Sequence, residues 1–234
     1  MSLTAAILAG GLGTRLQPVL PDTAKTVAQV AGRPFIDYLL KQLTRAGATR
    51  IVLCTGFKSG QVRHQIGAAF AGVPVVYSEE SQPLGTGGAV GLAWKKYGDQ
   101  QAWLVTNGDS YLDLDIGGLL KAHASSGCLL TLAVVQVPDG ARYGTVEWSL
   151  ETRRVLAFKE KTGESAPAWI NGGVYVFQPE CLNTLANDKP LSLEKEVFPP
   201  WVRQGVNVYP VEGRFIDIGT PESYRMAQLF FDQQ

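Results

Sequence analysis

A short apolar run that leads directly into a glycine-rich loop limits how this chain can fold more than any other feature. Thr4 to Ile7 has the apolar character of a buried strand, and glycines follow it at positions 10, 11 and 13. Glycine removes side chains from a loop, so backbone N–H groups there can approach an anion closely. Arg15 adds a fork of donors that can grip a phosphate, and Lys25 adds a compact positive charge. This arrangement predicts an α/β sheet that holds a phosphorylated ligand at one edge.

Two better-known phosphate loops do not match this stretch. The dinucleotide fingerprint requires Gly-x-Gly-x-x-Gly, and the residues from Gly11 to Leu16 lack its third glycine. The P-loop requires Gly-x-x-x-x-Gly-Lys-Ser/Thr, a string that the chain does not contain. Taken alone, the loop could also be an ordinary strand-to-helix turn, so a phosphate-binding function needs support from residues elsewhere in the chain.

Composition and segment pattern restrict the class of protein. Of the 234 residues, 45% are apolar, and 21 basic side chains balance 21 acidic ones, which argues against nucleic acid as a partner. No apolar run is long enough to span a membrane, and the N-terminus lacks the basic segment of a signal peptide. Three cysteines, at 54, 128 and 181, are too scattered for a metal knuckle or a disulfide framework. A cytoplasmic protein that does not bind membranes is therefore expected.

Strand-like and helix-like segments alternate in the first half of the chain, which predicts a parallel sheet with helices on both faces. The expected strands are 4–7, 51–54, 73–77 and 102–105, and the expected helices are 34–46, 61–70 and 89–97. The second half is richer in strand-like runs and predicts mixed or antiparallel pairing. Its expected strands are 129–137, 143–148, 154–160 and 174–177, followed by a closing helix at 221–231.

Two aspartates are the candidate metal ligands. Asp109 lies just past the strand at 102–105, at the carboxyl edge where open α/β sheets place their ligands, and Asp217 follows another short strand. Carboxylate oxygens suit Mg²⁺, with phosphate and water completing its shell. Asp109 could instead cap a turn, and Asp217 could cap the last helix, although Thr220 fits that cap better. His64 and His123 have no partners at metal-ligand spacing and are expected on helix surfaces.

Short glycine-rich and charged motifs recur along the chain in a fixed order. The first runs from Gly10 to Pro18 as Gly-Gly-x-Gly-Thr-Arg-Leu-x-Pro, and Lys25 follows it. The others lie at 83–89, 107–109, 143–146, 158–161, 171–175 and 217–221. Each motif is weak alone, but the series resembles the sugar-1-phosphate nucleotidyltransferases over nearly the whole chain. One departure is the segment Ala24-Lys25-Thr26-Val27, where that family usually has Pro-Lys-Pro-Met, so the charge is kept and two rigid prolines are lost.

The resemblance implies a Rossmann-like three-layer α/β sandwich with a mixed, mostly parallel central sheet, formed by one domain over residues 1–234. The nucleotide-binding half would span about 1–115 and the sugar-binding half about 116–234. The implied reaction is attack by a sugar 1-phosphate on the α-phosphorus of a nucleoside triphosphate, which expels pyrophosphate. The attacking phosphate has a second pKa of about 6 and needs no strong base. Two anions must be brought together, which calls for Mg²⁺ and cationic side chains.

The resemblance also implies individual roles. Arg15, Lys25, Asp109 and Lys161 are the catalytic candidates, and Asp109 and Asp217 are the metal ligands. The nucleotide would contact Leu8, Ala9, Gly10, Gly11, Gly13, Thr14, Arg15, Lys25, Gly85, Thr86, Gly87 and Asn107, and the sugar would contact Gly144, Glu160, Lys161, Asn171 and Gly172. From the residues alone, 158–161 could equally be a solvated strand end, and Glu194 is favoured as a helix cap over a sugar contact.

Three of the motifs also indicate which nucleotide and which sugar phosphate the resemblance implies. The segments at 84–89, 170–175 and 192–195 are most similar to the short bacterial guanylyltransferases of the family, which implies GTP, D-glycero-D-manno-heptose 1-phosphate and a role in surface-polysaccharide synthesis. Mannose 1-phosphate and uridylyl or thymidylyl transfer stay open, as does the oligomeric state. So do three other classes: a metal-dependent glycosyltransferase, for which Asp113-Leu114-Asp115 has the required Asp-x-Asp form, a non-catalytic nucleotide-sugar sensor, and a cytidylyltransferase acting on a non-sugar phosphate.

Overall fold

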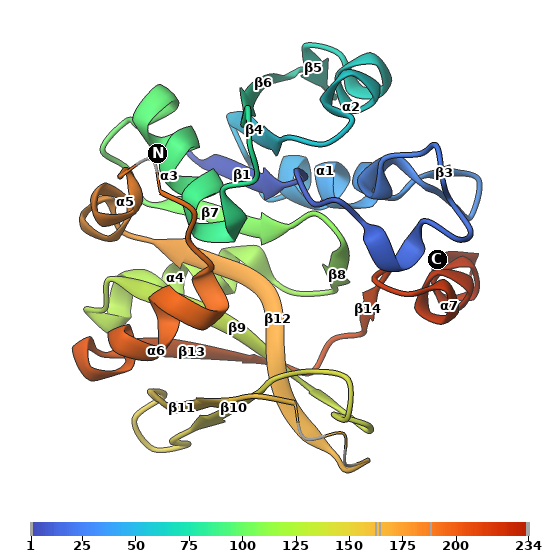
Figure 1. Cartoon of the computed structure of the whole chain (residues 1–234). Coiled ribbons are helices and arrows are strands. Elements are labelled where there is room, and N and C mark those ends of the chain that lie inside the picture. The colour runs from blue at the N-terminus through green and yellow to red at the C-terminus, as the bar shows by residue number, and fades with distance from the viewer. Residues whose placement is uncertain (1, 162, 164, 188, 233–234) are drawn as a thin grey trace.

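A single large sheet organises the protein, whose computed structural model describes residues 2–161, 163, 165–187 and 189–232 (Figure 1). Within this part of the chain the sheet has ten strands in the order β11-β10-β12-β7-β1-β4-β6-β5, and β9 and β13 extend it from β12. Its strands are β1 (Thr4–Leu8), β4 (Arg50–Thr55), β5 (Ala69–Phe70), β6 (Val73–Glu79), β7 (Trp103–Asn107), β9 (Leu130–Val137), β10 (Thr145–Trp148), β11 (Val155–Lys159), β12 (Ala168–Phe177) and β13 (Val206–Val211).

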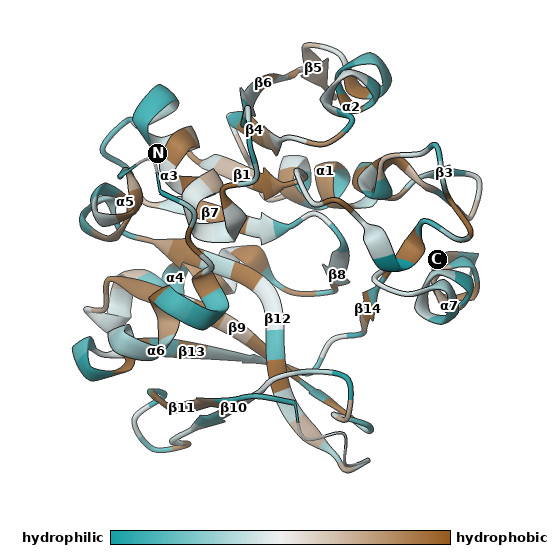
Figure 2. Ribbon diagram, in the orientation of Figure 1, coloured by the Kyte–Doolittle hydropathy of each residue, from teal (hydrophilic) through white to brown (hydrophobic). Residues whose placement is uncertain are grey.

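Helices cover both faces of the parallel part of this sheet. Strand β1 lies between β4 and β7 and is parallel to both. Successive residues of a strand point to opposite faces, so Ala5 and Ile7 pack with α1 (Phe35–Arg45), whereas Ala6 packs with α3 (Gly85–Tyr97). Figure 2 shows these central strands as predominantly apolar. The expected three-layer α/β fold is confirmed.

The second half of the chain joins the same sheet through the long strand β12, which runs from β7 to the β10–β11 hairpin at the bottom of Figure 1. Strand β12 is antiparallel to β7 and β9, and its register on β9 shifts between Asn171 and Tyr175. Gly173 has φ +74° within this irregular stretch, a conformation that glycine adopts without steric cost. The same sheet thereby continues from the expected nucleotide-binding half into the expected sugar-binding half.

Smaller elements complete the fold. Strands β8 (Ser110–Leu112) and β14 (Phe215–Asp217) form an antiparallel pair, and β2 (Gln29–Val30) pairs with β3 (Arg33–Pro34). The remaining α-helices are α2 (Ser59–Ile66), α4 (Ile116–Ser126), α5 (Pro179–Leu185), α6 (Phe198–Trp201) and α7 (Pro221–Asp232). Among the described helices, none is both long and apolar enough to cross a membrane.

Three element boundaries differ from expectation for identifiable reasons. The helix expected at 61–70 ends at Ile66, because Gly67 has φ +74° and the chain then forms the short strand β5. The helix expected from residue 89 begins at Gly85, so the second glycine motif forms its first turn. Strand β12 begins at Ala168 instead of residue 174, because its glycines form an irregularity inside the strand.

The expectation of a surface position is wrong for His123, which is 3% exposed, although His64 is exposed. The His123 ring lies between helix α4 and the sheet, with Nδ1 2.8 Å from the Thr131 hydroxyl and Nε2 2.9 Å from the Gln178 side-chain nitrogen. Burial lowers the pKa of His123 to about 4, because the charged imidazolium would lose its hydration. The fold therefore holds this ring in its neutral form near neutral pH.

We predict an acid-sensitive stability that depends on His123. Because its folded pKa lies below the unfolded value of 6.5, the unfolded chain binds the additional proton, and stability falls as the pH drops from about 6.5 to 4. His123→Gln should lower Tm at pH 7.5, yet lose roughly 5 °C less than the wild type on acidification to pH 4.5. Thermal unfolding followed by circular dichroism measures this difference. His64→Gln is the exposed control, and equal Tm losses in all three proteins would contradict the prediction.

Candidate active site

A pocket of about 440 Å³ opens where the carboxyl ends of β1 and β7 meet. This volume lies within the range typical of small-ligand sites. The pocket is lined by Leu8, Gly10, Gly11, Leu12, Gly13, Thr14, Arg15, Lys25, Thr26, Glu80, Pro83, Gly85, Thr86, Ala89, Asn107, Gly108, Asp109, Glu194 and Gly219. Residues from the first three glycine motifs and the last one therefore share one cavity.

Two glycines let the backbone of the pocket approach itself closely. A Cβ atom at Gly108 would lie 2.4 Å from the Leu8 carbonyl oxygen, closer than side-chain atoms pack. Gly13 has φ +61° and precedes the 3₁₀ turn η1 (Thr14–Leu16), which carries Arg15. The loop therefore needs glycine at these positions, and it leaves main-chain N–H groups without side chains over them beside the cavity.

Charged residues from distant segments gather at one side of the pocket. Lys25, in the 3₁₀ turn η2 (Lys25–Val27), places its ammonium 2.6 Å from Asp109 Oδ2. A Cβ atom at Gly219 would lie 2.7 Å from Asp217 Oδ1, 3.4 Å from Arg15 Nη2 and 3.7 Å from Lys25 Nζ. The four charged side chains that the sequence assigned to phosphate and metal therefore lie together.

Asp217 reaches Gly219 at the edge of the pocket because β14 pairs with β8, although Asp217 itself is not among the described residues that line the cavity. The Ile218 N–H donates to the Asp109 carbonyl oxygen at 2.8 Å, which brings the two candidate metal ligands beside one another. Asp217 Oδ1 accepts from the Gly219 N–H at 2.6 Å and from the Ser223 hydroxyl at 3.1 Å. Thr220, not Asp217, caps helix α7, because its hydroxyl oxygen accepts from the Ser223 N–H at 3.2 Å. Asp217 is therefore available for another function.

The two aspartates fit a hard divalent cation that retains other ligands. Within the described ranges, no group of three or more His, Cys, Asp or Glu side chains gathers as a closed metal site. Two carboxylates alone suit Mg²⁺, which proteins typically hold through one or two carboxylates together with substrate phosphates and water. Asp109 is 44% exposed at its side chain and can meet such a ligand without rearrangement of the core.

The expected sugar-contact residues lie outside this cavity. Among the described residues that line it, Gly144, Glu160, Lys161, Asn171 and Gly172 do not occur. They lie instead around β10, β11 and β12, where Gly144 and Glu160 flank the Thr145–Lys159 pair. Their role in sugar binding stays a prediction.

Two further assigned residues support the walls of the site. Ala9 is 4% exposed, and its N–H donates to the Cys54 carbonyl at 2.8 Å. The Gly87 N–H donates to the Leu191 carbonyl at 2.8 Å, and Gly87 does not occur among the described residues lining the cavity. Both residues therefore hold adjacent chain segments in place, while Gly85 and Thr86 line the cavity itself.

Two glutamates line the pocket, of which the sequence interpretation missed Glu80 and misassigned Glu194. Glu80 is half-buried, accepts the Leu84 N–H at 3.1 Å, and has a pKa raised by burial. The sequence signal for Glu80 was its position three residues before Pro83, where the second glycine motif begins. Glu194 accepts from the Thr86 hydroxyl at 2.9 Å, whereas Glu196 bonds the Ser192 N–H at the helix start. The favoured interpretation of Glu194 as the helix cap is therefore wrong.

Tyr175 of β12 is buried against Asn107, which lines the pocket. Its hydroxyl is buried and accepts from the Asn171 side-chain amide at 2.8 Å. Burial raises the pKa of Tyr175 well above its usual value, and the nearby negative charge of Glu194 acts in the same direction. The Asn171 amide is thereby fixed, since its Oδ1 also accepts the Gly173 N–H at 2.9 Å.

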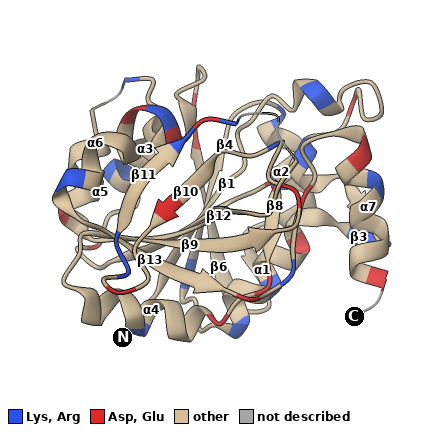
Figure 3. Cartoon of the chain, turned by 90° about the horizontal axis from the view of Figure 1, so that it is seen from below, with Lys and Arg blue, Asp and Glu red and all other residues tan. Residues whose placement is uncertain are grey.

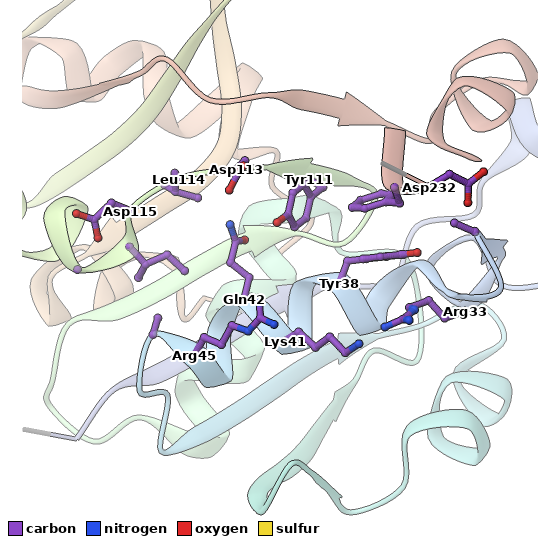
Figure 4. Close-up of a pocket in the computed structure, with 15 residues that line it drawn as sticks. Arg33, Tyr38, Lys41, Gln42, Arg45, Tyr111, Asp113, Leu114, Asp115 and Asp232 are labelled. Atoms are coloured by element: carbon purple, nitrogen blue, oxygen red, sulfur yellow. The ribbon is translucent and has the colours of Figure 1, made fainter. Parts of the chain in front are cut away.

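The Asp-x-Asp sequence lines a different and larger hollow of about 910 Å³ (Figure 4). Asp113 and Asp115 line it opposite Lys41 and Arg45 of helix α1. In the part of the chain that the structure describes, neither aspartate lines the glycine-loop pocket. A glycosyltransferase metal motif must meet the nucleotide phosphates, so this placement does not support the glycosyltransferase alternative.

Basic and acidic residues are interspersed in the view of Figure 3.

Fold and site together define an α/β protein with a glycine-rich pocket that Arg15 and Lys25 line at the carboxyl ends of its central strands. Residues 4–234 match the nucleotidyl transferase family model, and the chain belongs to that family. It is 35% identical over 231 residues to a D-glycero-alpha-D-manno-heptose 1-phosphate guanylyltransferase of Aneurinibacillus thermoaerophilus, with 97% of each chain covered. It is 34% identical to a mannose-1-phosphate guanylyltransferase of Mycobacterium tuberculosis, covering 94% of this chain and 62% of that one. The resemblance inferred from the motifs is confirmed.

Solved structures agree with this assignment. HddC from Yersinia pseudotuberculosis has a TM-score of 0.85 and 32% identity, with 98% of this chain and 99% of that chain covered. Its complex with GMP-PN has a TM-score of 0.84 and 30% identity at the same coverage. The likeness therefore extends over the whole sheet, including the region around β10–β12.

We predict that two aspartates four residues apart differ sharply in importance. Asp109→Asn, like Lys25→Ala, should lower kcat at least ~100-fold with the fold intact, because each residue acts on transition-state charge. Asp113→Asn should change kcat less than about threefold, since Asp113 lines the other hollow. Steady-state pyrophosphate release, with circular dichroism as the folding control, measures both. Severe loss in Asp113→Asn would restore the glycosyltransferase alternative, and near-normal turnover in Asp109→Asn would remove that residue from the mechanism.

Proposed function

We propose that the protein transfers a guanylyl group from GTP to D-glycero-α-D-manno-heptose 1-phosphate and forms GDP-heptose and pyrophosphate. The observation that carries this proposal is that Arg15, Lys25 and Asp109 line the glycine-loop pocket and that Asp217 lies beside them, next to Gly219. Heptose 1-phosphate guanylyltransferases that match nearly end to end support the substrate choice, including one from Campylobacter jejuni at 33% identity. The proposal includes a cytoplasmic location, where GTP is available, and a role of the product in surface-polysaccharide synthesis.

The chain's own residues account for the requirements of the reaction. Arg15 binds the β- and γ-phosphates and the departing pyrophosphate, and Lys25 neutralises charge around the α-phosphate. Asp109 and Asp217 are the residues that would hold Mg²⁺, which when bound supplies further neutralisation of the phosphates. Lys161 and Glu160 bind the phosphate and hydroxyls of the sugar. No residue is required as a strong base, because the attacking phosphate is already largely dianionic at pH 7.

Glu80 supports guanine as the base. Guanine presents two adjacent donors, N1–H and the 2-amino group, and a carboxylate offers two acceptors with matching geometry. Glu80 lines the same pocket as Pro83 and Gly85 of the second glycine motif. Adenine and uracil lack this donor pair, so a carboxylate here favours GTP over the other triphosphates.

Mannose 1-phosphate is the second candidate acceptor. The 34% identity to the mannose-1-phosphate guanylyltransferase of Mycobacterium tuberculosis favours it, because mannose and the heptose share the manno configuration around the ring. Binding sites discriminate weakly against a missing hydroxymethyl group unless a polar group contacts it. The choice between the two sugars is therefore a question for direct assay.

The activity is tested by measuring pyrophosphate release with Mg²⁺ for each of the four nucleoside triphosphates. Each is paired with the 1-phosphates of heptose, mannose, glucose and N-acetylglucosamine. We expect release that requires GTP and the heptose 1-phosphate together, and that stops when EDTA removes the metal. Silence across the matrix with folded, GTP-binding protein would contradict the proposal and favour the sensor or a non-sugar acceptor.

We predict that Glu80→Gln lowers kcat/KM for GTP by roughly 10- to 100-fold, because one of two acceptors for guanine is lost. ITP, which lacks the 2-amino group, should be a poor substrate of the wild type and less affected by the substitution. Glu79→Gln is the matched control, since the Glu79 carboxylate accepts from the Ser59 hydroxyl and lies near Arg63. Equal effects of both substitutions, or no effect of Glu80→Gln, would exclude Glu80 as the guanine contact.

A further inference from the structure

The segment between β9 and β10 carries an arginine that contacts a proposed metal ligand. Arg142 Nη2 lies 3.2 Å from Asp217 Oδ2, and the neighbouring Tyr143 donates its hydroxyl to the same oxygen. The Tyr143 ring packs edge-on against Phe215 at 5.8 Å between centroids. The Gly140 N–H donates to the Ala166 carbonyl at 2.9 Å. The Gly140 bond and the Tyr143 contacts hold the backbone on either side of Arg142, whose side chain is 39% exposed and also lies 5.6 Å from the centre of the Tyr143 ring.

Asp217 keeps its other donors whether or not Arg142 stays. The Gly219 N–H and the Ser223 hydroxyl hold Oδ1, and the Tyr143 hydroxyl bonds Oδ2. These three donors are neutral, whereas Arg142 carries a full positive charge. A divalent cation on the carboxylate repels a guanidinium at this distance but tolerates the neutral donors. A metal ion held by Asp217 would therefore weaken the contact with Arg142 more than the contacts with the neutral donors.

The hairpin register supplies a second destination for the displaced guanidinium. Thr145 of β10 pairs with Lys159 of β11, and a Cβ atom at Gly144 would lie 3.1 Å from the Lys159 carbonyl. Arg142 precedes Thr145 by three residues, where the chain forms a turn, and Lys161 follows Lys159 by two, so both residues leave the same end of this antiparallel hairpin. A guanidinium grips phosphate with two parallel hydrogen bonds, and a lysine adds a point charge. This end of the hairpin therefore offers paired cations for a phosphate.

We infer that Arg142 alternates between two partners. It pairs with Asp217 before the metal binds, and afterwards it holds the phosphate of the sugar 1-phosphate together with Lys161. The inference rests on the proposed function and adds Arg142 to it, a residue to which neither the motifs nor the proposed function gave a role. It also implies an order, in which the sugar phosphate gains its second cation only after the metal has occupied Asp217.

Arg142→Gln and Arg142→Lys test this inference through two independent measurements. Arg142→Gln should raise KM for the sugar 1-phosphate at least ~10-fold and change KM for GTP less than about twofold, because the charge-assisted fork is lost only there. Arg142→Lys should fall between, since it keeps the charge without the fork. Direct Mn²⁺ titration by electron paramagnetic resonance, without either substrate, should show at least ~3-fold tighter binding to Arg142→Gln than to the wild type.

Arg203→Gln is the matched control, because Arg203 is an exposed arginine in the 3₁₀ turn η4 (Val202–Gln204), outside the described cavity lining. It should leave both measurements unchanged. An unaltered sugar-phosphate KM in active Arg142→Gln, or Mn²⁺ binding no tighter than the wild type's, would overturn the inference. If the wild-type protein released no pyrophosphate, the proposed function would fail, and unchanged Mn²⁺ affinity would then still overturn the Arg142–metal competition by itself.

Discussion

One backbone hydrogen bond determines where the site can form. The Gly108 N–H donates to the Leu8 carbonyl at 2.9 Å and holds the ends of β1 and β7 together. The contact is possible because residue 108 lacks a Cβ atom, which would lie 2.4 Å from that oxygen. The glycine loop after β1 and Asp109 after β7 consequently leave the sheet side by side. Phosphate donors and a metal ligand are thus placed together before any side chain is considered.

Around this junction, carboxylates and cations neutralise one another. Lys25 pairs with Asp109, and Arg142 pairs with Asp217. A charge that is partly removed from water is costly unless a partner compensates it. The free protein meets this requirement internally. Under the proposed function, a metal–triphosphate complex would exchange the same partners, with the carboxylates turning to the metal and the cations to the phosphates.

Prediction from sequence succeeded where a local pattern has a single structural outcome. The apolar run at 4–7, the amphipathic helix at 34–46 and the strand that ends before Asp109 all appear within a residue or two. It failed where long-range contacts decide. His123 carries a polar side chain on a helix, and only the packing of α4 over Thr131 and Gln178 makes it buried. Glu194 was favoured as a helix cap, but its carboxylate accepts from the Ser192 hydroxyl and from that of Thr86, which is 108 residues away in sequence.

The sequence by itself determined the class of the protein, because ordered glycine and charge motifs are local requirements for holding a triphosphate at the end of a strand. It also named Arg15, Lys25, Asp109 and Asp217. Only the tertiary structure decided that these residues meet, since Asp217 reaches Asp109 through the β8–β14 pairing of segments about 100 residues apart. The structure likewise placed Glu80 in the pocket and Arg142 on Asp217. The spacing of residues along the sequence does not specify such contacts, because they depend on how separate strands turn and pack in three-dimensional space.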